Sequence, residues 1–146
     1  RVPMSTPVAL APARSTHLGR SVVVVTAALV ANIVLSLGAD QAFHALDVYP
    51  PWGQPMHEPE LNVVALSYRL VFGVASGWIV ALLAPGAPKR HALILGAIAT
   101  TLGALGVLGA AQVELGPLWY PVALMISAYP TVRLGAILHE RRARRA

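Results

Sequence analysis

The sequence predicts an all-α membrane protein, an antiparallel bundle of four transmembrane helices with both termini in the cytoplasm. Of the 146 residues, 56% are hydrophobic and 12% are charged, and the mean hydropathy is +0.64, which is unlike a soluble domain. Four apolar runs are each about 20 residues long, enough to cross a hydrocarbon core of about 30 Å. The later connections are short and contain proline and glycine, which reverse the chain direction.

The charge and the absent cysteines exclude several functions. A net charge of +5 and an isoelectric point near 10.5 could suit a nucleic-acid binder, but the basic residues flank the apolar runs and have no interleaved aromatic residues. We therefore expect no nucleic-acid partner. The absence of cysteine removes disulfides, thiolate nucleophiles and iron–sulfur clusters. No other nucleophile or acid–base set is apparent, so we expect neither an enzyme nor a bound cofactor.

Both ends of the chain are polar and basic. Residues 1–20 contain three prolines and three arginines without periodicity, which predicts a flexible arm in which Met4 is a candidate for the true start. Residues 140–146 form a polybasic tail. Its arginines are candidates for binding anionic lipid headgroups, with a plain topology anchor as the alternative; they are Arg141, Arg142, Arg144 and Arg145.

Residues 21–40 are expected to form the first span. A cleaved signal peptide is the alternative, because a basic arm precedes the apolar run and Ser36 and Gly38 offer small residues for cleavage, although the run is longer than usual. Asn32 falls near the middle of the membrane. Its amide should bond to a partner on another helix.

The connection from Asp40 to Glu60 is too polar to span and carries four prolines, which forbid a long helix. Its aromatic residues suit the headgroup level. Imidazole and carboxylate groups gather here as a possible metal site, although their spacing is not specific; they are His44, Asp47, His57, Glu58 and Glu60. Asp40 and His44, one helical turn apart, form a conceivable proton-relay pair.

The second span, residues 62–84, has two distinct faces. At 100° per residue its small and polar side chains fall on one line: Asn62, Ala65, Arg69, Gly73, Ser76 and Val80. The opposite face is apolar and suits lipid: Leu70, Val71, Val74, Trp78 and Ile79. Gly73 and Gly77 form a small-xxx-small pair, which lets a neighbouring helix approach closely.

The third and fourth spans are predicted at residues 91–113 and 118–138. On the third, Gly96 and Gly103 lie on a stripe of small residues that ends at Glu114, and on the fourth Pro130 predicts a kink. Histidines at the cytoplasmic edge of these two spans could be axial haem ligands, but neither is embedded in the bundle; they are His91 and His139.

Orientation follows from the basic residues. The arm, the connection between the second and third spans, and the tail hold nearly all of them, and Arg133 can reach the same side. We therefore place these segments in the cytoplasm and residues 47–60 outside. Arg69 is the exception, in the outward half of the bundle.

The chain resembles a group of small uncharacterised bacterial four-span membrane proteins. The similarity covers residues 35–134 and is carried by four stretches: residues 35–40, Pro-Pro-Trp-Gly-Gln-Pro-Met at 50–56, Tyr68-Arg69 followed by Gly73, and Leu-Ala-Pro-Gly-Ala-Pro-Lys-Arg-His-Ala-Leu at 83–93. The resemblance implies a bacterial inner-membrane location and four spans, and it implies no activity.

Arg69 is the leading candidate for a functional residue, because a cation at its depth in the membrane needs a partner. Counted along helices at 1.5 Å per residue, Arg69 lies about 22 Å from the cytoplasmic end, Asp40 about 30 Å and Glu114 about 34 Å. We therefore expect a buried ion pair with Asp40 first and Glu114 second. Three roles stay open: a structural pair, part of a pathway for an ion or substrate, or simple snorkelling.

Two functions from different classes follow. The first is a non-enzymatic structural or accessory subunit that packs against itself or other integral membrane proteins through its small-residue faces, namely Asn32, Gly73, Gly77, Gly96 and Gly103. The second is a small oligomeric transporter or channel with a polar pathway around Arg69. Four spans leave little room for a pore in one copy, so this second function requires oligomerisation.

Overall fold

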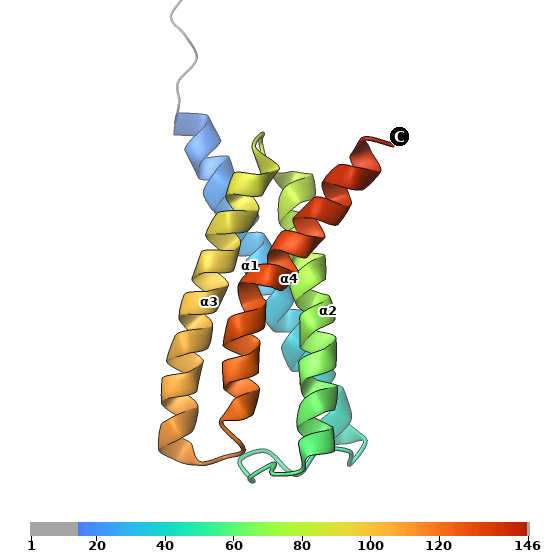
Figure 1. The fold of residues 1–146 in the computed structure, drawn as a ribbon, viewed down its shortest axis with the longest axis vertical. Coiled ribbons are helices and arrows are strands. Elements are labelled where there is room, and N and C mark those ends of the chain that lie inside the picture. Colours follow the sequence, from blue (N-terminus) through green and yellow to red (C-terminus); the bar gives the residue numbers. More distant parts are fainter. Residues whose placement is uncertain (1–14, 146) are drawn as a thin grey trace, which may run out of the picture.

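The computed structural model describes residues 15–145, which form a bundle of four helices (Figure 1). These are α1 (Ser15–Ala45), α2 (Pro59–Leu83), α3 (Pro88–Val113) and α4 (Trp119–Ala143), and this part of the chain has no strand. Each helix is long and apolar enough to cross a membrane. The 25 residues of α2 extend about 38 Å, which exceeds a hydrocarbon core of about 30 Å. The predicted all-α four-helix bundle is confirmed.

All four helices extend beyond their predicted bounds: α2 and α3 each begin three residues early, and α1 and α4 extend further. Helix α1 begins at Ser15 and runs to Ala45, so residues 15–20 of the predicted arm are helical, while residues 1–14 lie outside the described residues. Helix α4 continues to Ala143, through half of the predicted tail. No proline follows Pro12 before α1 ends, and alanine, arginine and glutamate in the tail favour helix. The apolar runs therefore marked the membrane crossings but not the ends of the helices.

The connections use residues suited to reversing the chain. Pro59 and Pro88 stand in the first turns of α2 and α3, where a missing N–H group leaves no hydrogen bond broken. Between these helices, Gly86 and Ala87 have φ angles of 91° and 46°, and Glu114 ends α3 with a φ of 48°. These left-handed residues let α3 pack antiparallel to both of its neighbours.

The connections at the other end of the bundle are bonded to each other. The Met56 N–H group donates to the Leu115 carbonyl at 2.8 Å. The buried Asn62 amide donates to the carbonyl oxygens of Met56 and Glu58, at 3.0 and 2.9 Å. Asn62 therefore holds the proline-rich connection against the start of α2.

Alternating helix directions give the bundle two different ends. The start of α1, the α2–α3 connection and the end of α4 lie at one end, and the other two connections lie at the opposite end (Figure 1). The first end, which we call the basic end, carries Lys89, Arg90 and the tail arginines. The second, the acidic end, carries Glu58, Glu60 and Glu114.

Helix α4 packs against both α2 and α3, whereas α1 contacts α2 and α3 but not α4 within the described residues. The tightest contact is the crossing of α2 and α4. A β-carbon at Gly77 would fall on the backbone of Val132, and one at Gly135 would fall on the backbone of Val74. Two glycines facing in opposite directions thus bring the two backbones into direct contact.

The predicted inward face of α2 is confirmed, since Asn62, Ala65, Gly73, Ser76 and Val80 are all buried. The predicted lipid face needs a correction. Val71 is 63% exposed, but the backbone of Val74 and Trp78 lies against Gly135 of α4. Helix α2 is therefore covered on two sides, and only part of its apolar face meets lipid.

Pro130 lies near the middle of α4, as the sequence predicted for a kink. Its ring removes one backbone N–H donor from the helix. Figure 1 shows the first half of α4 upright between α2 and α3 and the second half leaning across α2. The lean carries the C-terminal end of α4 toward the α2 side of the bundle.

Candidate functional site

An ion pair joins α1 to α2 in the acidic half of the bundle. The Arg69 guanidinium lies 2.5 Å from Asp40, with the two side chains 24% and 11% exposed. The neighbouring Tyr68 hydroxyl donates to the other oxygen of the Asp40 carboxylate. Both oxygens of Asp40 are therefore bonded by consecutive residues of one helix turn.

A second tyrosine extends this network into the connection after α1. The Tyr49 hydroxyl donates to the Tyr68 hydroxyl at 3.4 Å. Burial raises the pKa of Tyr49 above its ordinary value of 10.0, with the hydrogen bond to Tyr68 acting in the opposite direction. Tyr49 is therefore uncharged at neutral pH and acts as a hydrogen-bond donor.

Aromatic rings enclose the cation. The guanidinium carbon of Arg69 lies 5.6 Å from the centre of the Tyr68 ring and 5.7 Å from the centre of the Tyr120 ring. Phe43 stacks on Tyr49 and Tyr68, with ring centres 5.0 and 5.6 Å apart. Charge attraction, hydrogen bonds and cation–π contacts all favour the charged arginine in this position.

Glu114, the second candidate partner, is not brought to Arg69. Within residues 15–145 the structure has two ion pairs, Arg69–Asp40 and Lys89–Glu140, and Glu114 belongs to neither. Glu114 is exposed at the C-terminal cap of α3. Since α3 packs on α4 on this side of the bundle, its end lies apart from the α1–α2 contact.

A second polar contact between α1 and α2 lies deeper in the bundle. The Asn32 amide donates to the Ser76 hydroxyl at 3.1 Å, and that hydroxyl donates to the Phe72 carbonyl at 2.8 Å. The amide of Asn32 therefore has the interhelical partner that its depth required.

A cavity of about 300 Å³ lies beside this contact, between α1 and α4. All four helices line it, and its walls include polar side chains at mid-membrane depth: Asn32, Ser36, Arg69, Ser76, Ser127 and Thr131. Gly73 and Gly103 also line it. The cavity lies where the backbones of α1 and α4 stand apart from one another.

The glycines singled out from the sequence lie at helix contacts. Added β-carbons at Gly73, Gly96 and Gly103 would lie 2.6 Å from Thr131, 2.7 Å from Tyr129 and 3.0 Å from Met125. All three contacted residues belong to α4. The glycines of α2 and α3 therefore form the two grooves that hold α4.

The structure does not bring the candidate metal ligands together. In the described residues, no three His, Asp or Glu side chains lie close enough to hold a metal ion. His44 lies against Trp52, with ring centres 4.1 Å apart. No hydrogen bond joins His44 to Asp40, whose oxygens are bonded by Tyr68 and Arg69. The sequence suggested both sites from proximity along the chain, which does not fix side-chain direction.

The two candidate haem histidines have other neighbours. His91 is buried, with Nδ1 3.1 Å from the Ala87 carbonyl and Nε2 2.9 Å from the Ser21 hydroxyl, so both of its ring nitrogens are engaged. His139 packs edge-on against Trp78. His91 instead joins the start of α3 to α1 near the basic end.

The tail arginines divide between the two sides of α4. Arg144 lines a pocket between α3 and α4, and Arg141 lines both this pocket and the hollow beside Trp78. Arg142 lies over the ring of Trp78 at 5.9 Å, and Arg145 lines a hollow on that same side. The four tail arginines therefore contribute to two different surfaces, and Arg141 lies between these surfaces.

The sequence analysis assigned no role in the bundle to Tyr49, Tyr68, Tyr120 or Gly135. Tyr68 could have been found, because it precedes Arg69 and both point toward the end of α1. The positions of Tyr49 and Tyr120 depend on how the connections fold.

The chain matches no protein-family model, no curated protein and no solved structure. The fold itself defines the class, a multi-pass helical membrane protein. The resemblance to small bacterial four-span proteins stays a prediction.

Proposed function

We propose that this chain is a non-enzymatic structural or accessory subunit of the bacterial inner membrane, which binds a transmembrane helix of a second copy or of another membrane protein. One observation carries the proposal: polar side chains line a mid-membrane cavity at the place where α1 stands apart from α4. Polar walls next to lipid are costly, and a covering helix removes that cost.

We infer that the cavity opens between α1 and the outer half of α3. Figure 1 shows α1 crossing behind the bundle, from beside α3 at the basic end to beside α2 at the acidic end. On α3, an added β-carbon at Gly106 would meet nothing within 4 Å, one turn beyond Gly103, which lines the cavity. Ile33 and Leu37 of α1 line it too and are 45% and 54% exposed. A helix backbone can therefore approach α3 closely here.

Single-cysteine cross-linking in native membranes tests this proposal, because the natural chain has no cysteine. Ile33→Cys and Gly106→Cys should cross-link, either at twice the 15.3 kDa mass or to a different protein. Val71→Cys is the control, since Val71 is 63% exposed on α2, away from the cavity. Equal cross-linking from all three positions, or none from the first two, would refute the proposal.

A transporter or channel is the second candidate, favoured by one observation: Arg69 lines the same cavity as Asn32 and Ser76. A polar path could then run from the acidic end toward mid-membrane. The tight pairing of Arg69 with Asp40 and its aromatic cover argue for a fixed structural role. Transport would be favoured if the natural protein gave an ion or substrate flux in proteoliposomes and the double variant Arg69→Ala with Asp40→Ala, while stably folded, gave none.

We propose that the bundle is oriented in the membrane with its basic end in the cytoplasm. Within residues 15–145, every lysine and arginine except Arg69 belongs to a segment at or near this end, and short connections rich in these residues are retained in the cytoplasm. A reporter fused after the tail should be active only if it functions in the cytoplasm. Activity of a periplasmic reporter would reverse the assignment.

A further inference from the structure

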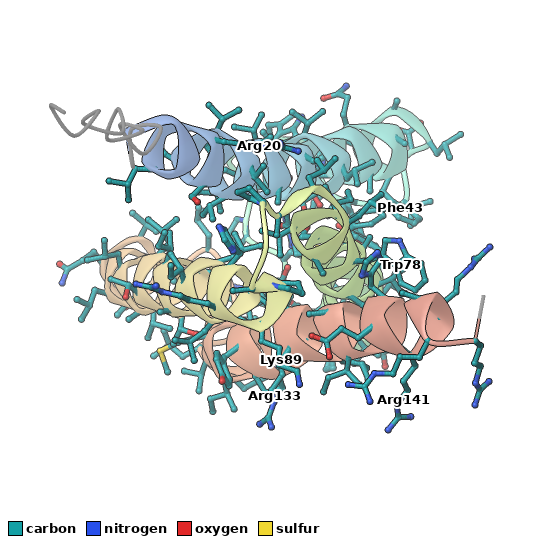
Figure 2. All side chains as sticks on the ribbon, turned by 90° about the horizontal axis from the view of Figure 1, so that it is seen from above. Arg20, Phe43, Trp78, Lys89, Arg133 and Arg141 are labelled. Carbon is teal, nitrogen blue, oxygen red and sulfur yellow. The ribbon has the colours of Figure 1, made fainter. Side chains whose placement is uncertain are left out.

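Four basic side chains gather around a pocket of about 520 Å³ between the basic ends of α3 and α4. They are Lys89, Arg133, Arg141 and Arg144, and a single carboxylate, Glu140, lies among them. Viewed from above, Lys89, Arg133 and Arg141 lie on the α4 side of the bundle, and Arg20 of α1 lies on the opposite side (Figure 2). The pocket is thus distinct from the mid-membrane cavity.

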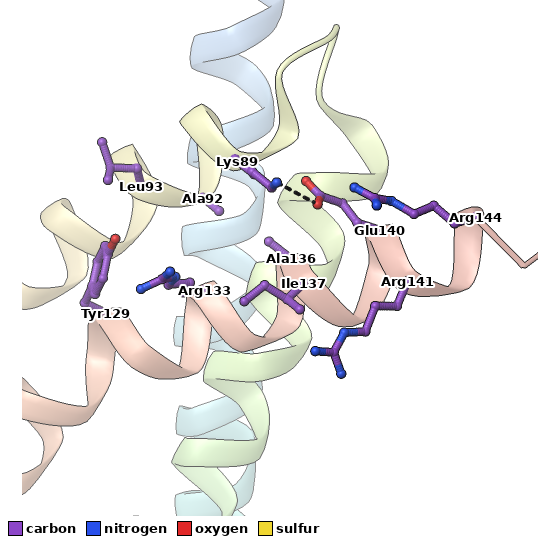
Figure 3. Close-up of a pocket in the computed structure, with 10 residues that line it drawn as sticks. All are labelled: Lys89, Ala92, Leu93, Tyr129, Arg133, Ala136, Ile137, Glu140, Arg141 and Arg144. Atoms are coloured by element: carbon purple, nitrogen blue, oxygen red, sulfur yellow. Dashed lines mark ion pairs between the residues drawn. The ribbon is translucent and has the colours of Figure 1, made fainter.

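The charges in this pocket are not balanced. Lys89 pairs with Glu140 at 3.4 Å but remains 70% exposed. Figure 3 shows Arg144 extending toward the carboxylate of Glu140, with Arg133 on the other side of Lys89, near Tyr129. Within residues 15–145, Arg133, Arg141 and Arg144 have no ion pair with a carboxylate. The pocket is therefore arranged to attract an anion.

The floor of the pocket is apolar. Ala92 and Ala136 give it depth, and Leu93, Tyr129 and Ile137 line the remaining wall. Leu93 is 52% exposed, and it belongs to the apolar stretch of α3 that crosses the membrane. A small soluble anion would use only the charges, whereas an anion attached to an acyl chain would use both surfaces.

We propose that this pocket binds the headgroup of an anionic phospholipid. The phosphate lies between Lys89 and Arg133 over Ala136, and an acyl chain descends beside Leu93 and Tyr129. Basic pockets between helices at the cytoplasmic face are suited to such headgroups. Glu140 competes with the phosphate for Lys89, so the charge of Glu140 weakens binding of the lipid to the pocket.

Phosphatidylglycerol titrated into the full chain in neutral detergent tests the proposal, with thermal stabilisation as the readout. The double variant Lys89→Gln and Arg133→Gln should bind about 25-fold more weakly, at about fivefold for each charge lost. The matched control is Arg142→Gln with Arg145→Gln, which removes the same charge from the other side of α4. It should lose less than about threefold, because those arginines act only through long-range attraction.

The Glu140→Gln variant should change the affinity for phosphatidylglycerol in the opposite direction. It should tighten phosphatidylglycerol binding by about fivefold, and a gain cannot arise from misfolding. Equal losses in both double variants would show a diffuse attraction to the tail and overturn the site. Equal stabilisation by phosphatidylcholine, or by inorganic phosphate alone, would also overturn it, because the first would need no negative charge and the second no acyl chain.

Discussion

The bundle holds its helices together in two different ways. Helices α2 and α4 meet backbone to backbone at Gly77 and Gly135. Helix α1 is joined to the rest by a few polar contacts spaced along its length: Ser21 to His91, Asn32 to Ser76, and Asp40 to Arg69 and Tyr68. Small apolar residues also pack between α1 and α2, among them Ala28 and Val80.

This difference follows from the lipid solvent. Lipid gives no hydrophobic drive for helix association, so a bundle needs either close packing or interhelical polar bonds. Glycine contacts tolerate no added atom, whereas polar contacts tolerate paired replacement but not the loss of one partner. The α2–α4 contact should therefore be sensitive to size and the α1 contacts sensitive to polarity.

The largest expected effect is at the α2–α4 crossing. Gly77→Leu or Gly135→Leu should lower the free energy of unfolding by at least about 3 kcal/mol, because the new side chain would overlap the backbone of the facing helix. Gly38→Leu is the control, since a β-carbon there meets nothing, and it should change stability by less than about 0.5 kcal/mol. Thermal melts in detergent measure both. Similar losses at Gly38 would remove the special role of the crossing.

The grooves that meet side chains should give an intermediate effect. Gly73→Ala places a methyl group 2.6 Å from the Thr131 hydroxyl, and that side chain can rotate away at the expense of its bonds to the Ser127 and Ala128 carbonyls. We expect a loss of about 1 to 3 kcal/mol. Pairing Gly73→Ala with Thr131→Ala should recover part of it. No recovery in the pair would mean that another contact limits the groove.

The deeper polar contact should have a smaller effect. Asn32→Ala should destabilise the protein by about 1 kcal/mol, with a coupling to Ser76→Ala of about 0.6 kcal/mol, the average for hydrogen bonds between membrane helices. A double-mutant cycle in detergent measures the coupling. Strictly additive losses would show that the two residues act independently.

The smallest expected effect concerns Tyr49 at high pH. Because the folded protein raises its pKa above 10.0, Tyr49 contributes stability that is present below about pH 10 and is lost as the pH rises further. The Tyr49→Phe variant should therefore lose less stability than the natural protein as the pH rises from about 9 to about 11, a range that extends roughly one unit on either side of the ordinary tyrosine pKa. A steeper loss in the variant would reverse the sign of the argument.

Periodicity predicted the fold well, because lipid imposes a simple rule on spans and faces. The line of Asn62, Ala65, Gly73, Ser76 and Val80 could be read from 100° spacing alone, and all five are buried. Gly135 could not be found this way, because its role depends on the angle at which α4 crosses α2. The sequence also placed Val74 and Trp78 toward lipid, since it does not show that α4 covers a second side of α2.

The candidate site was only partly predictable. Counting residues from the basic end ranked Asp40 ahead of Glu114 as a partner for Arg69, and the structure pairs Arg69 with Asp40. Depth along the membrane is readable because every helix rises by the same amount per residue. The contacts of Tyr49 and Tyr120 depend on how the helices lie side by side and on how the connections fold. The sequence gives no comparable measure of these lateral positions.

The central claim is that the Arg69–Asp40 pair holds α1 to the bundle, and a double-mutant cycle tests it most directly. Arg69→Ala and Asp40→Ala should each destabilise the protein by about 3 kcal/mol, because each leaves a buried charge without its partner. The double variant should lose much less than the sum of the two, and it should keep the cross-links from Ile33→Cys and Gly106→Cys. Additive losses, or single variants as stable as the natural protein, would contradict the claim.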